Sequence, residues 1–306
     1  MDKTSSYYQQ VQLLVSVLPF VAREDIFALK GGTAINLFVR HFPRLSVDID
    51  LVYLPLKLRD EALRECRDAL DRIAQSINEQ LRDATVIQSY RDNDDSLRLI
   101  VKLNNVGIKV ELSPVLRGTV FEPEVRALVE SVEDEFGHAE MQVVSIADLY
   151  AGKICAALDR QHPRDLFDVK ELLANEGVTD DIRQAFLVYL ISHNRSPEEL
   201  LLPSLQPIEE IFSSAFQGMT FEPVTVEQLV IARDELIELI NQSLLDSEKH
   251  FLLSFYRGHP EWELLPFEHI KDLPAVKWKL VNLDKMSPAK RRDSIKTLEN
   301  ILGIES

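Results

Sequence analysis

Two aspartates separated by one residue, Asp48 and Asp50, are the residues whose types and spacing most directly indicate chemistry. They lie in residues 45–54, where apolar and polar side chains alternate, so we expect a β-strand with one apolar face and one carboxylate face. Side chains at positions i and i+2 of a strand point to the same side, about 7 Å apart at Cα. Two neighbouring carboxylates repel each other unless a cation lies between them, and hard ions such as Mg²⁺ take oxygen ligands. The pair predicts a divalent-cation site, and a solvated strand face is the alternative.

Upstream of the aspartates, Gly31-Gly32-Thr33 follows an apolar segment, 27–30, and leads into residues 33–41, whose spacing is helical. Glycines at such a turn let the backbone approach a ligand, and the first N–H groups of a helix attract an anion. The hydroxyl of Thr33 adds one more donor. The segment predicts a phosphate-binding turn. A tight strand–helix connection without a ligand is the alternative, and the glycines taken alone favour it.

A third carboxylate, Glu111, lies in the strand-like segment 108–112, where Lys109 and Glu111 share one face. If this strand neighbours residues 45–54, Glu111 joins the two aspartates. Three carboxylates can hold two metal ions about 4 Å apart, an arrangement that activates an attacking oxygen and stabilises a leaving one. The alternative is an ion pair of Glu111 with Lys109 or Lys102 on a solvated sheet face.

The elements that must position these residues fall into two groups along the chain. Periodicity predicts helices at 6–22 and 57–82, strands at 85–90, 97–103, 108–112 and 141–144, and a hairpin turn at 104–107. Pro114 is expected to close the sheet segment. Helices are expected at 145–160 and 163–177, and beyond 178 helical spacing is divided by prolines. We expect an α/β domain, a mixed sheet with flanking helices, over 1–145 and an all-α domain over 146–306.

The composition is that of a globular chain of 306 residues, 45% hydrophobic and 27% charged. Its apolar runs are too short to span a bilayer, and the N-terminus does not resemble a secretory signal. The two cysteines, Cys66 and Cys155, match no metal or redox spacing. We therefore expect buried thiols and a cytoplasmic protein without a membrane partner.

The formal net charge of −16 argues against strong non-specific binding to nucleic acid. One segment reverses the sign: residues 271–296 carry eight Lys and Arg against three Asp. With Trp278 available for stacking, this stretch could bind an RNA backbone. The alternative, which we favour from the sequence, is a solvated helix surface with Trp278 in the core.

The residues Leu29–Ala34, with Arg44, Ser46 and Asp48–Leu51, resemble the first motif of the AbiEii/AbiGii toxin family. This family consists of nucleotidyltransferases of the polymerase-beta-like superfamily, so the resemblance implies a nucleotidyltransferase-like fold for residues 1–145. A glycine pair, a helix, Asp-x-Asp and a later acid follow the order of that superfamily, and Arg-x-Ser-x-Asp-x-Asp is the narrower form of this family. One departure is Gly32, where the commoner pattern has serine, so one side-chain donor to the phosphates is missing.

A second block, residues 153–168, resembles the Lys…Ala-Leu…Arg…Arg-Asp-Leu-x-Asp motif of the same family. The resemblance implies that Lys153 and Asp165 are active-site residues. Lys153 is then expected to reach the triphosphate, and Arg160 or Arg164 to add a bidentate phosphate contact. Two alternatives stay open, because Asp165 in a first helical turn also fits a capping role and Asp168 with Arg164 also fits a structural pair.

The resemblance implies a metal-dependent nucleotidyltransferase toxin of a toxin–antitoxin or abortive-infection system. It transfers NMP from an NTP to an RNA acceptor, the 3′ end of a tRNA, and releases pyrophosphate. The expected triphosphate contacts are Lys30, Gly31, Gly32 and Thr33. The expected ligands of two Mg²⁺ ions are Asp48, Asp50 and Glu111, and Glu111 is also able to accept a proton. A cognate antitoxin encoded nearby is the implied partner, and it need not contact the toxin.

Three other functions remain open from the sequence. A nucleotidyltransferase that modifies a small molecule or a protein would use the same metal site, and acceptor labelling distinguishes it. A nucleotide-binding module without catalysis would lack the convergence of the three carboxylates. A kinase-like phosphotransferase would release a nucleoside diphosphate instead of pyrophosphate.

Overall fold

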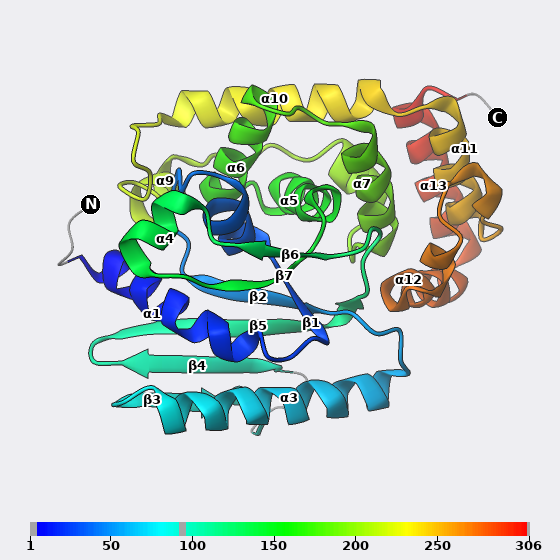
Figure 1. Ribbon diagram of the computed structural model, residues 1–306. Helices are drawn as coiled ribbons and strands as arrows, with labels where there is room; N and C mark the ends of the chain where they lie inside the picture. Colours follow the sequence, from blue (N-terminus) through cyan, green and yellow to red (C-terminus); the bar gives the residue numbers. More distant parts are fainter. Residues whose placement is uncertain (1–4, 92–95, 305–306) are drawn as a thin grey trace. The chain divides into compact units, whose positions relative to one another are not determined.

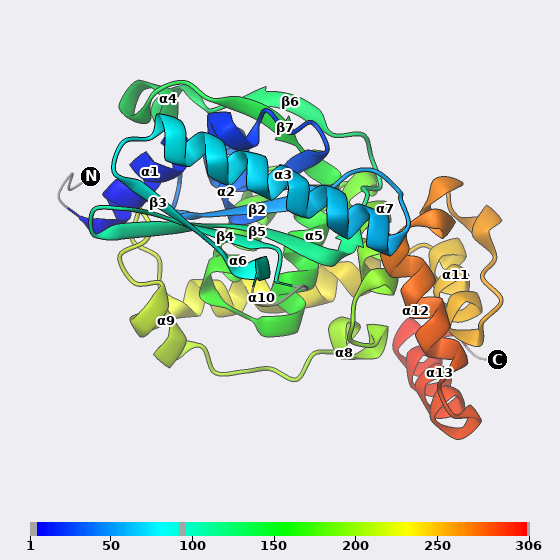
Figure 2. The same cartoon turned by 90° about the horizontal axis from the view of Figure 1, so that it is seen from below.

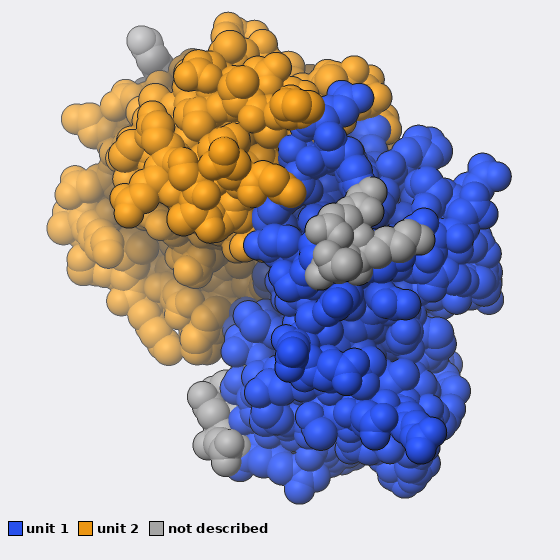
Figure 3. All heavy atoms as spheres, turned by 90° about the vertical axis from the view of Figure 1, so that its left-hand side faces the viewer, with its two compact units in different colours: residues 1–145, 219–222 blue, residues 146–218, 223–306 orange. Residues whose placement is uncertain are grey.

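The structure, a computed structural model, describes residues 5–91 and 96–304. The chain forms two compact units, which Figure 3 distinguishes by colour. Unit 1 consists of residues 1–145 and 219–222, and unit 2 consists of residues 146–218 and 223–306. The sequence places a boundary after residue 145 but gives no sign that the short segment 219–222 returns to unit 1.

Within the described residues, unit 1 is built on one mixed sheet of seven strands in the order β3-β4-β5-β2-β1-β7-β6 (Figure 1). The strands are β1 (Phe27–Lys30), β2 (Asp48–Tyr53), β3 (Ala84–Gln88), β4 (Arg98–Leu103), β5 (Val106–Arg117), β6 (Glu124–Ala127) and β7 (Glu140–Val143). The pairs β2–β5 and β1–β7 are parallel, and the other neighbours are antiparallel. This confirms the expected mixed sheet with flanking helices.

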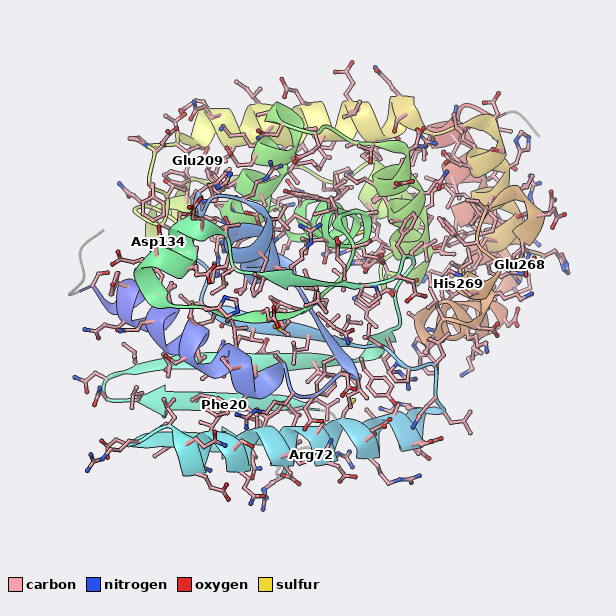
Figure 4. All side chains as sticks on the ribbon, in the orientation of Figure 1. Phe20, Arg72, Asp134, Glu209, Glu268 and His269 are labelled. Atoms are coloured by element: carbon pink, nitrogen blue, oxygen red, sulfur yellow. The ribbon has the colours of Figure 1, made fainter. Side chains whose placement is uncertain are left out.

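Two long helices of unit 1 cover the sheet. The helical segments are α1 (Ser6–Val21), α2 (Gly31–Thr33), the π-helical turn η1 (Ala34–Val39), α3 (Arg59–Gln80), the 3₁₀ turn η2 (Ser89–Arg91) and α4 (Glu130–Phe136). Helix α1 packs against β5 and β7, α3 packs against β3 and β4, and the two helices also contact each other (Figures 1 and 2). Arg72 of α3, labelled in Figure 4, pairs with Glu24 beyond the end of α1 at 2.6 Å.

The two faces of the sheet differ in polarity because strand residues alternate between them. On one face Ile49, Leu99 and Val110 are fully buried, and each such side chain contributes about 1.5–3 kcal/mol relative to exposure. The opposite face carries charged side chains that are half-buried or exposed. We call this the polar face, and it comprises Lys30, Asp48, Asp50, Arg98, Lys109 and Glu111.

Unit 2 is helical throughout its described residues. Its α-helices are α5 (Ile146–Arg160), α6 (Pro163–Ala174), α7 (Asp180–Ser192), α8 (Pro197–Leu201), α9 (Glu209–Ala215), α10 (Val226–Ser243), α11 (Asp246–Arg257), α12 (Pro274–Asp284) and α13 (Pro288–Leu302). Two 3₁₀ turns, η3 (Trp262–Leu264) and η4 (His269–Asp272), precede α12. Helix α5 packs on α7 and α6 packs on α10, around a core that includes Tyr150 and Phe186.

Pro114 does not close the sheet segment, so this expectation was wrong. Strand β5 continues to Arg117, and its register against β2 shifts between Leu51 and Tyr53. A bulge of this kind accommodates a proline, which has no N–H to donate to the ladder. The hydroxyl of Ser113 accepts a hydrogen bond from the Leu116 N–H at 3.0 Å. This bond gives a partner to a backbone N–H at the irregular part of the strand.

The segment 219–222, which we call the strap, is held to unit 1 by backbone hydrogen bonds. Leu45 N–H donates to the Met219 carbonyl at 2.8 Å, and Phe221 N–H donates to the Pro43 carbonyl at 3.2 Å. Arg44 and Thr220 form an antiparallel bridge between these two contacts. The strap therefore fixes the backbone that leads into β2.

Both cysteines are buried free thiols, as expected. Burial raises the pKa of the Cys66 thiol to about 12, so it stays protonated and unreactive at neutral pH. Across residues 5–91 and 96–304, the structure contains no helix with the length and hydropathy needed to span a lipid bilayer.

Candidate active site

The three carboxylates expected to cooperate lie on the polar face of unit 1. Asp48 and Asp50 are two positions apart on β2, so their side chains leave the sheet on the same side. In the parallel ladder Asp50 is the register partner of Glu111, and Asp48 is the partner of Lys109. Neighbours in register share a face, so Glu111 stands beside Asp50. The expected juxtaposition of residues 50 and 111 is therefore what the fold produces.

The glycine pair forms the turn between β1 and α2, directly against Asp50. Gly31 has φ +78°, a left-handed conformation that L side chains rarely adopt. A Cβ at this position would lie 2.6 Å from Oδ2 of Asp50, so a carboxylate oxygen occupies the space that a side chain would take. At Gly32 a Cβ would lie 2.7 Å from Nη2 of Arg44. Backbone conformation therefore favours glycine at position 31, and at position 32 a side chain would have to displace the Arg44 guanidinium.

Thr33 is fully buried, and its hydroxyl is used inside the protein. Its Oγ1 donates to the backbone carbonyl of Asp48 at 2.5 Å and lies 3.0 Å from Oγ of Ser46. A hydroxyl has one proton, so a bond to this carbonyl is not compatible with simultaneous donation to a phosphate. The geometry supports a positioning role in which Thr33 holds β2 at Asp48, instead of the phosphate contact expected from the sequence.

Two side chains next to Asp50 and Glu111 set the electrostatics of the polar face. Lys30 is the antiparallel register partner of Asp50. Within residues 5–91 and 96–304 neither the Lys30 ammonium nor the Asp50 carboxylate makes a hydrogen bond or ion pair, so both are available to a ligand. Glu111 instead forms an ion pair with Arg98, its partner on β4. Lys102 and Lys109, the two lysines considered as alternatives, do not form this ion pair with Glu111.

Arg98 was not among the predicted site residues, although the sequence held a signal for it. Asn104 and Asn105 form a two-residue hairpin turn, and Asn104 has φ +52°. Such a turn places Leu103 opposite Val106 and fixes the register of the whole hairpin. Counting back from the turn brings Arg98 opposite Glu111.

The donor set of the polar face fits a hard divalent cation through Asp48 and Asp50. Among the described residues, no group of three Asp, Glu, His or Cys side chains is close enough to hold a metal ion by itself. Mg²⁺ is typically bound by one or two carboxylates together with water and substrate phosphates, so two aspartates suffice when a triphosphate supplies the other oxygens. The three-carboxylate arrangement expected for two ions stays a prediction, because Arg98 engages Glu111.

The second predicted group of site residues forms a buried ionic cluster in unit 2. The Lys153 ammonium lies 2.8 Å from Asp165 and 3.0 Å from Asp168, and all three side chains are buried. Arg160 donates two hydrogen bonds to Asp165, at 2.5 and 3.0 Å. Burial would raise the pKa of the Asp165 carboxyl, but Lys153 and Arg160 outweigh it and hold that pKa below its usual range. Asp165 is therefore ionised at neutral pH, and two acidic side chains of the cluster face two basic ones.

Arg164 behaves differently from Arg160. Its backbone N–H donates to Nδ1 of His162 at 3.1 Å, which makes His162 the N-terminal cap of α6. In the part of the chain that the structure describes, the Arg164 guanidinium has no hydrogen-bond or ion-pair partner. The expected structural pair of Arg164 with Asp168 is thus absent from these residues, because Lys153 takes Asp168.

The chain is a nucleotidyltransferase, since a family model described as "Nucleotidyl transferase AbiEii toxin, Type IV TA system" matches residues 12–280. It belongs to the AbiEii family, the nucleotidyltransferase toxins of type IV toxin–antitoxin systems. This confirms the resemblance of the sequence motifs. A toxin of such a system implies an antitoxin partner and an NTP substrate.

Among solved structures, the chain is similar to MenT4, a nucleotidyltransferase toxin from Mycobacterium tuberculosis H37Rv, with a TM-score of 0.62 and 14% sequence identity. The similarity covers 98% of this chain and 95% of the MenT4 chain, and at this identity it shows a shared fold. No curated protein matches the chain.

Proposed function

We propose that the protein transfers a nucleoside monophosphate from an NTP to an RNA acceptor, the 3′ end of a tRNA, with release of pyrophosphate. Family membership supplies the class of reaction and the toxin role. The observation that carries the proposal is the Asp50 carboxylate, which has no hydrogen-bond or ion-pair partner among residues 5–91 and 96–304 and lies against the Gly31 turn, between Lys30 and Glu111 in register. An anionic triphosphate needs a cation and backbone N–H groups close by, and a reacting hydroxyl needs a carboxylate nearby.

In this proposal the chain's own groups bind and orient the triphosphate. The Lys30 ammonium and the backbone N–H groups at Gly31 and Gly32 contact phosphate oxygens, because a helix N-terminus favours negative charge. Asp48 and Asp50 would hold a divalent cation, which when bound polarises the α-phosphate and lowers the pKa of the acceptor hydroxyl. Thr33 keeps the strand carrying both aspartates in position.

Glu111 is the proposed proton acceptor. The acceptor hydroxyl oxygen forms a bond to the α-phosphorus, the bond from that phosphorus to the bridging oxygen of the β-phosphate breaks, and pyrophosphate departs. The hydroxyl proton passes to the Glu111 carboxylate, which must first leave Arg98. Freed from that ion pair, the Arg98 guanidinium can contact a phosphate oxygen in bidentate geometry.

Lys153 and Asp165 stay in the proposal as residues implied by the family motif. Lys153 would neutralise charge on the departing pyrophosphate. Their balanced cluster with Asp168 and Arg160 also stabilises unit 2, so a loss of activity on substitution counts as catalytic only when unit 2 remains folded.

The test is transfer of label from each α-labelled NTP to total RNA with Mg²⁺, followed by sizing of the product and assay of pyrophosphate. We expect labelled RNA of tRNA size and loss of transfer on chelation of the metal. Asp50→Asn removes the charge with little change in volume and should abolish transfer. Glu140→Gln, an exposed acid on β7, is the matched control and should not.

Two results would contradict the proposal. Undiminished transfer by a folded Asp50→Asn variant would remove the polar face from the mechanism. If label appears only on small molecules or on protein, the acceptor is not RNA. Release of a nucleoside diphosphate would indicate phosphoryl transfer instead of nucleotidyl transfer.

A further inference from the structure

Trp278 is exposed on α12, contrary to the sequence expectation that it lies in the core. The side chain is 54% exposed, and Val281, one turn further along the helix, is 43% exposed. The opposite side of α12 is buried through Val276 and Leu283 and packs on α7. One side of α12 therefore packs against the rest of unit 2, and the opposite side exposes a large aromatic ring to solvent.

The other tryptophan shows that this exposure is specific to the position. Trp262 packs against Phe251 and Phe255, with ring centroids 5.6 and 6.1 Å apart. Trp278 instead has the Lys285 ammonium 5.8 Å from its ring centroid, two helical turns along the same side of α12. A cation beside an exposed indole keeps the ring oriented and adds positive charge next to a stacking surface.

The basic residues of the segment 271–296, of which Lys285 lies beside Trp278, divide into anchors and a solvent-facing set. The buried Lys279 ammonium donates to the carbonyls of His193 and Arg195, both at 2.7 Å, and Arg291 donates to the carbonyl of Tyr256 at 2.9 Å. These bonds fix α12 and α13 within unit 2. The solvent-facing set is Lys271, Lys277, Lys285, Lys290, Arg292 and Lys296.

Positive charge exceeds negative charge in residues 271–296 of a chain whose net charge is −16, although the exposed Glu261, Glu263 and Glu268 directly precede the segment. Among the acids of residues 271–296, Asp272 pairs with Lys277 at 2.9 Å, and Asp284 and Asp293 are exposed. Eight Lys and Arg against three Asp leave the segment cationic. Helices α11, α12 and α13 gather at one end of unit 2 in both ribbon views (Figures 1 and 2).

We propose that Trp278 and the solvent-facing basic set form a binding surface for single-stranded RNA, with a base stacked on Trp278 and phosphates contacting the lysines and Arg292. This deepens the proposed function and rests on its RNA acceptor. An aromatic platform flanked by cations is the combination that binds single strands without reading their sequence. Charge complementarity favours a polyanion, because a purely apolar partner would gain nothing from the exposed cations, of which, among the described residues, only Lys277 is paired with an acid of this segment.

The presence of two tryptophans allows a direct test. In a Trp262→Phe background Trp278 is the sole indole, and titration with oligouridylate should quench its fluorescence. Trp278→Ala should weaken oligouridylate binding about 5- to 150-fold, the range for loss of one stacked base, whereas Trp278→Phe should retain most of the affinity. Inorganic polyphosphate, a polyanion without bases, should bind both tryptophan variants equally.

Joint substitution of Lys285, Lys290 and Arg292 by Gln should reduce the dependence of oligouridylate affinity on salt, since each lost phosphate contact removes about 0.7 from the logarithmic slope. Equal affinity of wild type and Trp278→Ala, with no quenching, would overturn the proposal. So would a concentration-dependent dimer that Trp278→Ala dissociates, or binding to anionic vesicles in preference to oligouridylate.

The experiment needs neither NTP nor metal, so it is independent of catalysis. Asp50→Asn should bind oligouridylate normally while failing in transfer. If transfer to RNA were absent in the wild type but quenching and the Trp278 dependence held, the proposed acceptor would fail and the surface would stand.

Discussion

Replacement of Gly31 by alanine tests the central geometry of the polar face. The new Cβ would lie 2.6 Å from Oδ2 of Asp50, so the carboxylate must move by about 1 Å to reach an ordinary van der Waals distance. A displacement of that size in a reacting geometry can cost about 100-fold in rate. The backbone at φ +78° adds about 1–2 kcal/mol of strain, which should lower Tm by about 2–8 °C.

Gly177→Ala is the matched control. Gly177 has φ +69°, and a Cβ there would meet nothing within 4 Å. It should lose similar stability and keep full transfer of labelled nucleotide. The reasoning is refuted if Gly31→Ala transfers at the wild-type rate, or if Gly177→Ala loses as much activity, because strain alone would then explain the effect.

Three further predictions concern charged groups. Arg98→Gln should lower the Mg²⁺ concentration for half-maximal transfer by about 5-fold, since a neighbouring positive charge is removed, and Arg98→Lys should not. Lys153→Met should lower the Tm by several degrees or more, because a buried carboxylate loses its partner at a cost of about 3–5 kcal/mol, and adding Asp165→Asn should recover part of the loss. Burial lowers the pKa of Lys279 to about 8, so the unfolded chain binds more protons between there and the ordinary value of 10.5. Stability in urea should therefore rise across that pH range, and Lys279→Met should flatten the rise.

Local periodicity was sufficient for the parts of the site that lie on single elements. Alternation along β2 put Asp48 and Asp50 on one face, and the same rule put Glu111 on a defined face of β5. No local pattern specifies which distant strand will be the neighbour, so the parallel pairing that makes Glu111 the partner of Asp50 does not follow from the sequence alone.

Features that depend on distant contacts were not accessible from local patterns. Strand β6 and helix α4 lie in a stretch where periodicity predicts no element, and both have few buried residues of their own. The exposure of Trp278 could not be read from its apolar character, since burial is a tendency of residue types and a binding surface is the usual exception. The role of Thr33 depends on the position of the Asp48 carbonyl, which is separated from Thr33 by residues 34–47.

The strap has a consequence for how the molecule responds to damage. Because residues 219–222 belong to unit 1, the chain passes between the units after residues 145, 218 and 222. A cleavage at 145 would place the backbone partners of Leu45 and Pro43 on a separate fragment, joined to the N-terminal fragment only by noncovalent contacts. Thermal unfolding of unit 2 would likewise disturb the strap, which is hydrogen-bonded to the backbone that leads into β2. Thermal unfolding or proteolysis of unit 2 should therefore change the positions of Asp48 and Asp50 in unit 1, because the strap is covalently continuous with unit 2.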